Sequence, residues 1–421
     1  MRNTIKLIAY QSLWSAAVLM TLFVTDPCRA GDWPQILGPD RNGVAVDERL
    51  VDSFPAQGPS VLWEHRVGEG FAGVAVAAGQ VIVFHRVNDT DTAEALEALS
   101  GAPIWKQEFP ASYAGGINAD RGPRCVPVVH EGSVYLFSSG NELHSVDLKT
   151  GTRRWSRNLA ADFDIPDSYF GAGSTPIVAG DSLLVNVGGR KGAGIVAFSL
   201  QDGKTVWKAT DEQASYSSPT SATLNGVPQV IFATRLSAVS IDPVAGKVRW
   251  RFPFGARGPT VNAATPQVLD GRLFLTASYG VGAVYRKIGK TDTTEVWTNN
   301  DTMSSQFSTP VPYKGHLYGV DGRQDVPPAR LRCFDPQTGK IQWTKNEFPV
   351  ANLIVADGKL VIVTDDGGLI LAAAASDSYH ELARARLSRA TTRALPALSN
   401  GLLYVRDTSS LKCVDLRRAN K

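Results

Sequence analysis

Arg332–Trp343, RCFDPQTGKIQW, is the stretch of sequence that decides the fold. A small residue stands two positions before an aspartate, Thr-Gly-Lys follows, and a tryptophan closes the stretch four residues after the glycine. The same spelling returns at four other places with the same glycine-to-tryptophan offset of four. The five pairs are Gly101 and Trp105, Gly151 and Trp155, Gly203 and Trp207, Gly246 and Trp250, and Gly339 and Trp343. Self-similarity at a fixed period indicates a repeat architecture.

The residues before each motif also follow one pattern. Val128–Phe137 reads VVHEGSVYLF, Val178–Val187 reads VAGDSLLVNV, and Val355–Val363 reads VADGKLVIV. Two apolar runs joined by a glycine-containing turn are typical of a β-hairpin. The motif itself supplies a third strand, a turn and a fourth strand that carries the tryptophan. Each repeat is therefore predicted to be a four-stranded antiparallel meander.

The spacing of the tryptophans predicts the number of repeats. Successive tryptophans are 42, 50, 52, 43, 47 and 46 residues apart, and we expect Leu382 to occupy the next position. The series comprises Trp63, Trp105, Trp155, Trp207, Trp250, Trp297 and Trp343, of which Trp63 and Trp297 belong to weaker copies. Four strands at this period are typical of a β-propeller.

The two ends of the repeat region complement each other. Leu411–Leu416, LKCVDL, is a third strand with no fourth strand after it, and Pro59–Val67, PSVLWEHRV, is a fourth strand with none before it. We therefore predict an all-β, eight-bladed propeller whose ring is closed by the N-terminal strand. Closure would remove the exposed edges that an open ring presents.

The chain is expected to contain three segments. Residues 1–30 resemble a secretory signal peptide, with Arg2 and Lys6 before the apolar stretch Leu7–Val24 and Cys28-Arg-Ala30 as a cleavage site. Residues 31–58 are expected to form an extension packed on the propeller, and residues 59–417 form the propeller itself. The signal predicts a periplasmic or secreted protein with no membrane span in the mature chain. An uncleaved signal acting as a membrane anchor is the alternative.

Charge and cysteine content exclude some classes of function. Removal of residues 1–30 takes away three basic residues and one acidic residue, which lowers the formal net charge from +3 to about +1. With no basic run in the remainder, nucleic-acid binding has no support. Cys125, Cys333 and Cys413 are an odd number, so they cannot all pair within the chain, and we interpret them as small buried residues. A monomer is expected.

Candidate functional residues lie in the long links between predicted blades. In a propeller the links from the outer strand of one blade to the inner strand of the next lie on one face, around the channel mouth, and loops of this kind often carry function. These residues could line a polar funnel: Tyr113, Asn118, Asp120, Arg121, Arg124, Tyr169, Asn262 and Gln306. No residue is assigned as catalytic, metal-binding or cofactor-binding.

The repeated motif resembles the tryptophan-docking motif of the pyrroloquinoline-quinone-like (PQQ-like) propeller superfamily, and the resemblance runs from Ser60 to Leu416. It implies that each tryptophan lies between neighbouring blades and packs near the glycine of the next repeat. Quinone-dependent dehydrogenases of this superfamily would have adjacent cysteines, a set of Glu, Asn and Asp residues that holds Ca²⁺, and a catalytic Asp base. This sequence has no adjacent cysteines and no long insertions.

The chain is more similar to the non-catalytic BamB-like branch, in length and export signal, although it lacks a lipidation cysteine. We therefore expect a non-enzymatic scaffold of the bacterial cell envelope, without a cofactor, that binds an envelope protein or peptide segment, by strand addition among other modes. One alternative is a dehydrogenase with PQQ and Ca²⁺. Another is a carbohydrate-binding propeller, for which Tyr113, Tyr169 and Tyr216 would supply aromatic faces.

Overall fold

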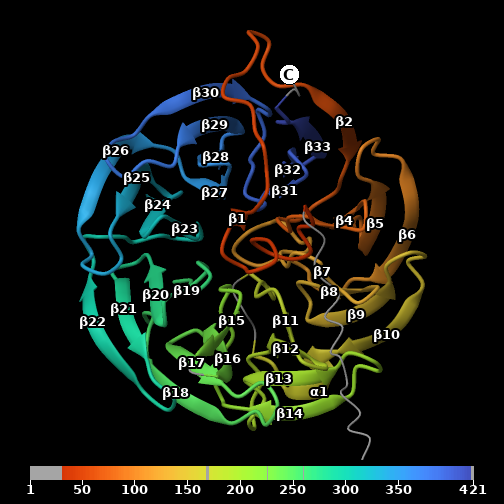
Figure 1. The fold of residues 1–421 in the computed structure, drawn as a ribbon. Coiled ribbons are helices and arrows are strands. Elements are labelled where there is room, and N and C mark those ends of the chain that lie inside the picture. The colour runs from red at the N-terminus through yellow and green to blue at the C-terminus, as the bar shows by residue number, and fades with distance from the viewer. Residues whose placement is uncertain (1–30, 167–169, 225, 259, 419–421) are drawn as a thin grey trace, which may run out of the picture.

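The computed structural model describes residues 31–166, 170–224, 226–258 and 260–418. It confirms the predicted architecture, because eight four-stranded antiparallel blades form a ring around a central channel (Figure 1). The predicted signal peptide and Tyr169 lie outside the described residues. In the described ranges, no helix is long and apolar enough to cross a membrane.

Blades one to four run outward from the channel in chain order, as predicted for a meander. Their strands are β3 (Ala75–Ala77), β4 (Gln80–Val87), β5 (Thr90–Glu97) and β6 (Pro103–Pro110); β7 (Val128–His130), β8 (Ser133–Phe137), β9 (Glu142–Asp147) and β10 (Arg153–Asn158); β11 (Ile177–Ala179), β12 (Ser182–Asn186), β13 (Ile195–Ser199) and β14 (Thr205–Ala209); and β15 (Thr220–Leu224), β16 (Val227–Ala233), β17 (Ser237–Ile241) and β18 (Val248–Pro253). A short helix, α1 (Leu159–Phe163), follows β10.

Blades five to seven repeat this order, and blade eight takes its outer strand from the N-terminal part of the chain. Their strands are β19 (Gln267–Leu269), β20 (Arg272–Ala277), β21 (Gly282–Ile288) and β22 (Thr293–Asn299); β23 (Val311–Tyr313), β24 (His316–Arg323), β25 (Val326–Phe334) and β26 (Ile341–Phe348); β27 (Ala351–Ala356), β28 (Lys359–Thr364), β29 (Gly368–Ala373) and β30 (Glu381–Arg386); and β31 (Ala397–Ser399), β32 (Leu402–Arg406), β33 (Ser410–Asp415) and β2 (Val61–Arg66).

The ring closes as the sequence predicts. Strand β2 pairs antiparallel with β33, with Trp63 opposite Cys413 and Arg66 opposite Ser410. The last blade is thereby built from both ends of the propeller, and hydrogen bonds replace the covalent continuity that the other blades have.

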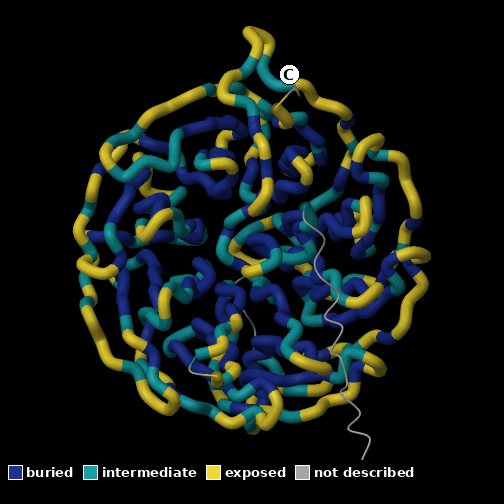
Figure 2. Tube along the Cα trace, in the orientation of Figure 1, coloured by how far each residue is buried: buried dark blue, intermediate teal, exposed yellow. Residues whose placement is uncertain are grey.

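The hydrophobic core lies between blades. Alternate residues of a strand point to opposite faces, so Val134 and Leu136 of β8 pack toward blade one. Tyr135 and Phe137 of the same strand pack toward blade three. Inner strands are consequently buried on both faces, whereas outer strands alternate between exposed and buried residues (Figure 2).

Tryptophans of the outer strands join each blade to the next. Six of the seven donate a hydrogen bond from Nε1 to a backbone carbonyl of the following blade, at 2.8–3.1 Å. Most of these rings also lie against a motif glycine, as Trp105 does against Gly151, where an added Cβ would approach the ring to 2.5 Å. Trp250 is the exception, because it donates to Gln229 Oε1 in its own blade. Blade five, which follows it, lacks the motif glycine.

The prediction for Leu382 is wrong. The pairing of β29 with β30 sets Ala383 opposite Leu371, directly beside a register shift. In other blades the tryptophan has this position, as Trp207 does opposite Ala197. Leu382 is the bulged residue and is 39 % exposed. The turn between β29 and β30 is longer than the corresponding turn of blade six, which displaces the register by one residue relative to the sequence pattern.

Residues 31–58 cross the channel and then run along blades seven and eight. Trp33 forms a β-bridge with Val76 of blade one, and β1 (Val44–Ala45) adds in parallel to the inner strand β27. Between these contacts Arg41 lies in the channel, 2 % exposed, and donates to the carbonyl oxygens of Pro219, Thr175 and Pro176. Burial lowers the pKa of this guanidinium to about 9.

His144 makes the stability of blade two sensitive to acid. Its ring stacks on Phe109 with centroids 3.9 Å apart, and burial, with a smaller contribution from Arg153, lowers its pKa to about 3. Below pH 6.5 the unfolded chain protonates this histidine and the folded chain does not, so stability falls as the pH falls. We expect a loss of about 2 kcal/mol from this group between pH 7 and pH 5.

Urea unfolding at the two pH values measures this effect. In His144→Gln the pH-dependent loss should be smaller than in the wild type by about the same 2 kcal/mol, because every other titrating group is common to both proteins. Equal losses in the two proteins would contradict the assignment.

Candidate functional site

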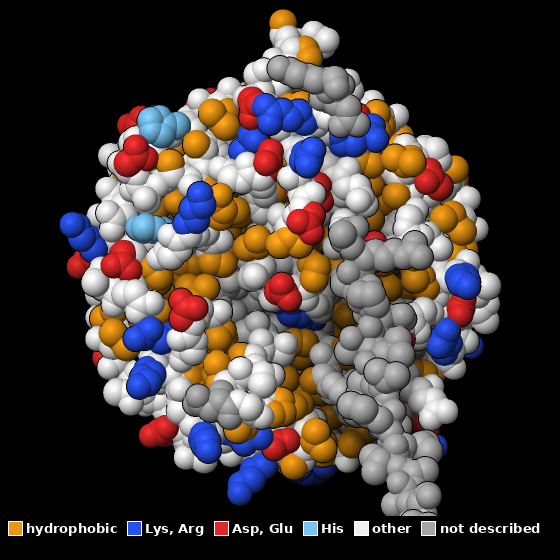
Figure 3. Space-filling view, in the orientation of Figure 1, with side chains coloured by type: hydrophobic (Ala, Val, Ile, Leu, Met, Phe, Trp, Pro, Cys, Tyr) orange, Lys and Arg blue, Asp and Glu red, His pale blue; other side chains and the backbone are white. Residues whose placement is uncertain are grey.

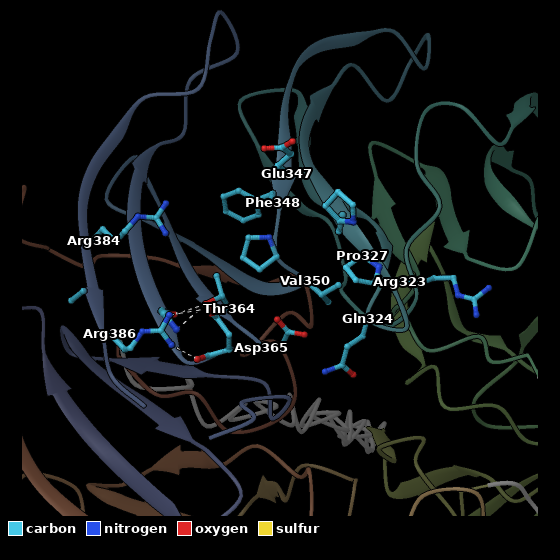
Figure 4. Close-up of a pocket in the computed structure, with 16 residues that line it drawn as sticks. Arg323, Gln324, Pro327, Glu347, Phe348, Val350, Thr364, Asp365, Arg384 and Arg386 are labelled. Carbon is cyan, nitrogen blue, oxygen red and sulfur yellow. Dashed lines mark hydrogen bonds and ion pairs between the residues drawn. The ribbon is translucent and has the colours of Figure 1, made fainter. Parts of the chain in front are cut away.

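A cleft of about 600 Å³ opens between blades six and seven, and it is the candidate functional site (Figure 4). It lies on the face of the ring that carries the links between blades, which we call the link face. Its walls come from the β24–β25 hairpin, the end of β26, the link Pro349–Val350, the β28–β29 turn and β30. Its volume lies within the about 300–1,000 Å³ typical of ligand-binding clefts.

The β24–β25 hairpin is longer than those of most other blades, and this extension forms one wall. Residues 322–330 are rich in Asp, Pro and Arg, a composition that predicts a loop, but the structure continues both strands, with Arg323 paired to Val326. Pro327 and Pro328 follow on β25 and are exposed. Because proline has no N–H to donate, this end of the hairpin cannot extend the ladder with regular hydrogen bonds.

The apolar part of the cleft comes from the end of β26. Its register shifts where Ala329 pairs with Phe348 and Leu331 with Lys345. Glu347 lies within this bulge with φ 53°, in the left-handed region. The bulge turns Phe348 inward, where it is 3 % exposed and in edge contact with Tyr379.

Three arginines at the rim are each neutralised by a carboxylate of their own blade. Arg384 forms two hydrogen bonds with Glu381, at 2.7 and 2.8 Å. Arg386 contacts Asp366 at 3.1 Å, and Arg323 pairs with Asp325 while its guanidinium lies 4.1 Å from the Tyr279 ring centroid. The three arginines alone would suggest a basic rim, but because each is paired with a carboxylate, the rim carries little net charge.

Two carboxylates of the cleft differ from these. In the described part of the chain, no Lys, Arg or His nitrogen lies within 4.0 Å of Asp365 or Glu347. Asp365 is half-buried at the inner end, and burial is the main reason that its pKa is raised; Asp366 adds to the shift, while Gln324 and Arg393 oppose it. Its backbone is held on both sides, by Asp365 N to Val350 O and Thr392 N to Asp365 O.

Five of the residues singled out in the sequence lie together on the link between β6 and β7. Asp120 accepts hydrogen bonds from the N–H groups of Gly70 and Gly122, and Asn118 accepts one from Asp120 N. Arg121 pairs with Glu69 and Asp89. These contacts hold the link against blade one, and they occupy the side chains that a ligand would need.

Arg124 and Tyr113 belong to an aromatic cluster at the channel mouth. The Arg124 guanidinium lies 5.3 Å from the Tyr113 ring centroid and 6.0 Å from that of Phe71. The Arg393 guanidinium lies 5.0 Å from the Phe71 centroid. Burial raises the pKa of Tyr113 and lowers that of Arg393. No pattern in the sequence pointed to Phe71 or Arg393, because they come from links far apart in the chain.

The other two described residues from this set lie apart from that link. Asn262 is 2 % exposed, and its amide donates to the carbonyls of Thr234, Arg235 and Phe254, which fixes a turn of blade four. Gln306 donates to Tyr279 Oη and accepts from Gln324 N, beside the cleft. Of the seven described residues of this set, five therefore share one link and two lie elsewhere.

Most cleft residues were missed at the level of sequence. In the sequence, Asp365 and Asp366 before Gly367 indicate only an oxygen-rich turn, and Phe348 has no signal at all. The long Asp-, Pro- and Arg-rich segment 322–330 was the one usable sign, since an extended hairpin changes the surface beside it. In the described ranges, no group of three His, Cys, Asp or Glu residues is placed to hold a metal ion.

Comparison with known proteins places this geometry in context. The sequence model of a family described as "Outer membrane protein assembly factor BamB" matches residues 44–164 and 121–345. The factor of that name from Salmonella typhimurium is 25 % identical over 372 residues, which cover 73 % of this chain and 87 % of that protein. A quinoprotein ethanol dehydrogenase from Pseudomonas aeruginosa is also 25 % identical, over 81 % of this chain and 59 % of its own length.

Two solved structures share the fold. BamB from Moraxella catarrhalis superposes with a TM-score of 0.63 and 15 % identity over 85 % of this chain and 99 % of that one. A europium-containing methanol dehydrogenase superposes with a TM-score of 0.68 and 13 % identity over 89 % of each chain. The chain spans about half of the length of the curated dehydrogenases that it matches first.

Proposed function

Because the chain belongs to the propeller family described as outer membrane protein assembly factor BamB, we propose that it is a non-enzymatic scaffold of the bacterial cell envelope. In this role it is exported by residues 1–30, acts as a monomer in the periplasm, and binds a segment of another envelope protein. It needs no cofactor.

The cleft between blades six and seven is the observation that carries this proposal. It is open along the link face, has an apolar wall at Phe348 and Pro349, and presents polar groups at its inner end. A groove of this composition suits an extended peptide segment, whose side chains would enter the cleft while its backbone stays near the surface. Figure 3 shows the other face of the ring, which carries the turns within blades rather than the links between them, and acidic and basic side chains are interspersed over it.

A dehydrogenase is the second candidate, and the similarity to the Pseudomonas aeruginosa enzyme is the observation that favours it. The residues present do not fit PQQ and Ca²⁺ well. Cys125, Cys333 and Cys413 are buried and free, and none is adjacent to another in the chain. At the channel mouth Arg406 already donates to the carbonyls of Ala72, Phe84 and Gly68, so it is not available to bind an anionic quinone.

Site-specific photocrosslinking in the host bacterium tests the scaffold. A photoreactive amino acid replaces Val326, which is 59 % exposed at the edge of the cleft. Val244 is 78 % exposed on a turn at the opposite face and provides the matched control. We expect a crosslinked product of defined mass from position 326 and none from position 244.

Absence of a product from position 326, or equal products from both positions, would contradict a specific binding role for the cleft. Calorimetric titration with PQQ, with and without Ca²⁺, separates the two candidate functions. The scaffold predicts no heat of binding, whereas tight one-to-one binding would favour the dehydrogenase.

A further inference from the structure

We infer that the cleft between blades six and seven recognises an arginine side chain of an extended partner segment, with Asp365 as the group that accepts its guanidinium. This inference rests on the proposed scaffold function and names the chemistry of the partner. Asp365, Phe348 and the prolines of the two walls, together with the charge balance of the rim, carry it.

The balance of charge in the cleft is the first reason. Each rim arginine already has an acidic partner: Arg384 has Glu381, Arg386 has Asp366, and Arg323 has Asp325. What remains in the described part of the chain is Asp365 inside and Glu347 at the outer end, neither within 4.0 Å of a basic nitrogen. Arg393 is the cation that acts on Asp365, and it does so without an ion pair.

A half-buried carboxylate in this position favours a cationic ligand. Removing a carboxylate from water is costly unless hydrogen bonds or an opposite charge compensate for it. Asp365 has the side chain of Gln324 as a partner, and its other acceptor sites face the cleft (Figure 4). A guanidinium can satisfy two carboxylate acceptor sites at once, because its planar fork matches the carboxylate geometry.

The shape of the cleft is the second reason. An arginine has an apolar stem of three methylene groups, and such stems commonly lie along apolar surface while the head reaches a polar group. Phe348, Pro349 and Val350 supply apolar wall on one side, and Pro327 and Pro328 supply it on the other, with Asp365 at the inner end. Glu347 at the outer end would favour a second basic residue in the same segment.

The position of Asp365 is fixed in a way that suits recognition. Its N–H donates to Val350 O of the preceding link, and its carbonyl accepts from Thr392 N of the following one. Neighbouring Thr364 donates to Asp366 at 2.5 Å, which keeps the two carboxylates in different directions. A carboxylate held by its backbone loses little freedom when a ligand binds, which favours affinity.

Selection from a phage-displayed library of random heptapeptides tests the inference without a known partner. We expect sequences selected on the wild-type protein to be enriched in arginine, and those selected on Asp365→Asn not to be. Asp40→Asn is the matched control, since Asp40 is exposed and lines a cavity at the channel instead. Melting temperatures of the three proteins should agree, because Asp365 has no ion pair to lose.

A selected peptide is then compared with its twin that carries citrulline, which has the shape of arginine without the charge. Fluorescence anisotropy should show about tenfold weaker binding or more for the twin, the cost of one lost charge-assisted hydrogen bond. The difference should disappear in Asp365→Asn and remain in Asp40→Asn.

Three results would overturn the inference: selected sequences without arginine enrichment, no selected sequence at all, or equal binding of the twin. If the chain forms a dimer in sedimentation and this dimer competes with peptide binding, the occupant of the cleft is a second copy of the chain and not a partner segment. If crosslinking at position 326 still succeeds in any of these cases, the scaffold function stands and the arginine specificity fails. Failure of both experiments would remove the proposed function as well.

Discussion

Trp63→Ala should destabilise the propeller by about 3–5 kcal/mol, the range measured for truncation of large buried aromatic residues. Trp63 lies in β2, the strand that closes the ring, and it is 9 % exposed. Its Nε1 donates to Ala98 O of blade one at 3.0 Å, and its ring lies against Gly101, where an added Cβ would come within 2.7 Å. The substitution removes both contacts and leaves a cavity between blades eight and one.

The position of Trp63 makes its loss more damaging than its area alone suggests. Hydrogen bonds to β33 hold strand β2 to blade eight, and this tryptophan holds it to blade one. No turn of the chain joins β2 directly to β33, unlike the outer strands of the other blades. Weakening the closure would allow the ring to open at one seam, which would expose edge strands.

Urea unfolding, monitored by far-ultraviolet circular dichroism, measures the effect. This signal comes from the backbone and does not depend on the tryptophan that is removed. Leu62→Ala is the matched control, because Leu62 is the neighbouring residue, is 40 % exposed, and should cost within about 0.5 kcal/mol as other surface substitutions do. Similar unfolding midpoints for the two variants would show that docking of this tryptophan does not stabilise the closure.

Arg41→Ala should cost about 3–5 kcal/mol and loosen the part of residues 31–45 that crosses the channel. The Arg41 guanidinium donates to Pro219 O at 2.9 Å, to Thr175 O at 3.4 Å and to Pro176 O. Each buried carbonyl left without a donor costs about 1–3 kcal/mol. The segment then keeps its contacts at Trp33 and β1 and the hydrogen bond that Arg41 O accepts from Gln267, but it loses the side-chain contacts of Arg41.

Two measurements separate the release of the segment from general unfolding. The melting temperature reports the loss of stability, and limited proteolysis reports new cleavage within residues 31–50 at temperatures well below melting. Arg41→Lys should give a partial effect, because an ammonium group cannot reach three carbonyls as the planar guanidinium does. Arg49→Ala, at an exposed position, should change neither measurement. Unchanged proteolysis in Arg41→Ala would contradict the role given to this arginine.

Much of the fold was readable from the chain because its information is local. A motif such as Arg332–Trp343 specifies a strand, a turn and a strand through nearby residues, and its recurrence gives the number of blades. The incomplete units at Leu411–Leu416 and Pro59–Val67 predicted the closure, since each lacks what the other has. Leu382 shows the limit: a bulge and a longer turn moved the register by one residue, and neither has a clear signature in the sequence.

The candidate site depended on contacts between distant residues, which no local pattern records. Asp365, Phe348 and Pro327 come together because two blades pack side by side and a hairpin of one is extended. Residues chosen for being polar and on long links, such as Asn262 and Asp120, turned out to hold backbone groups in place. A sequence shows which side chains are polar, but packing decides which of them are already paired, and an unpaired group in a cleft is what a ligand can recognise.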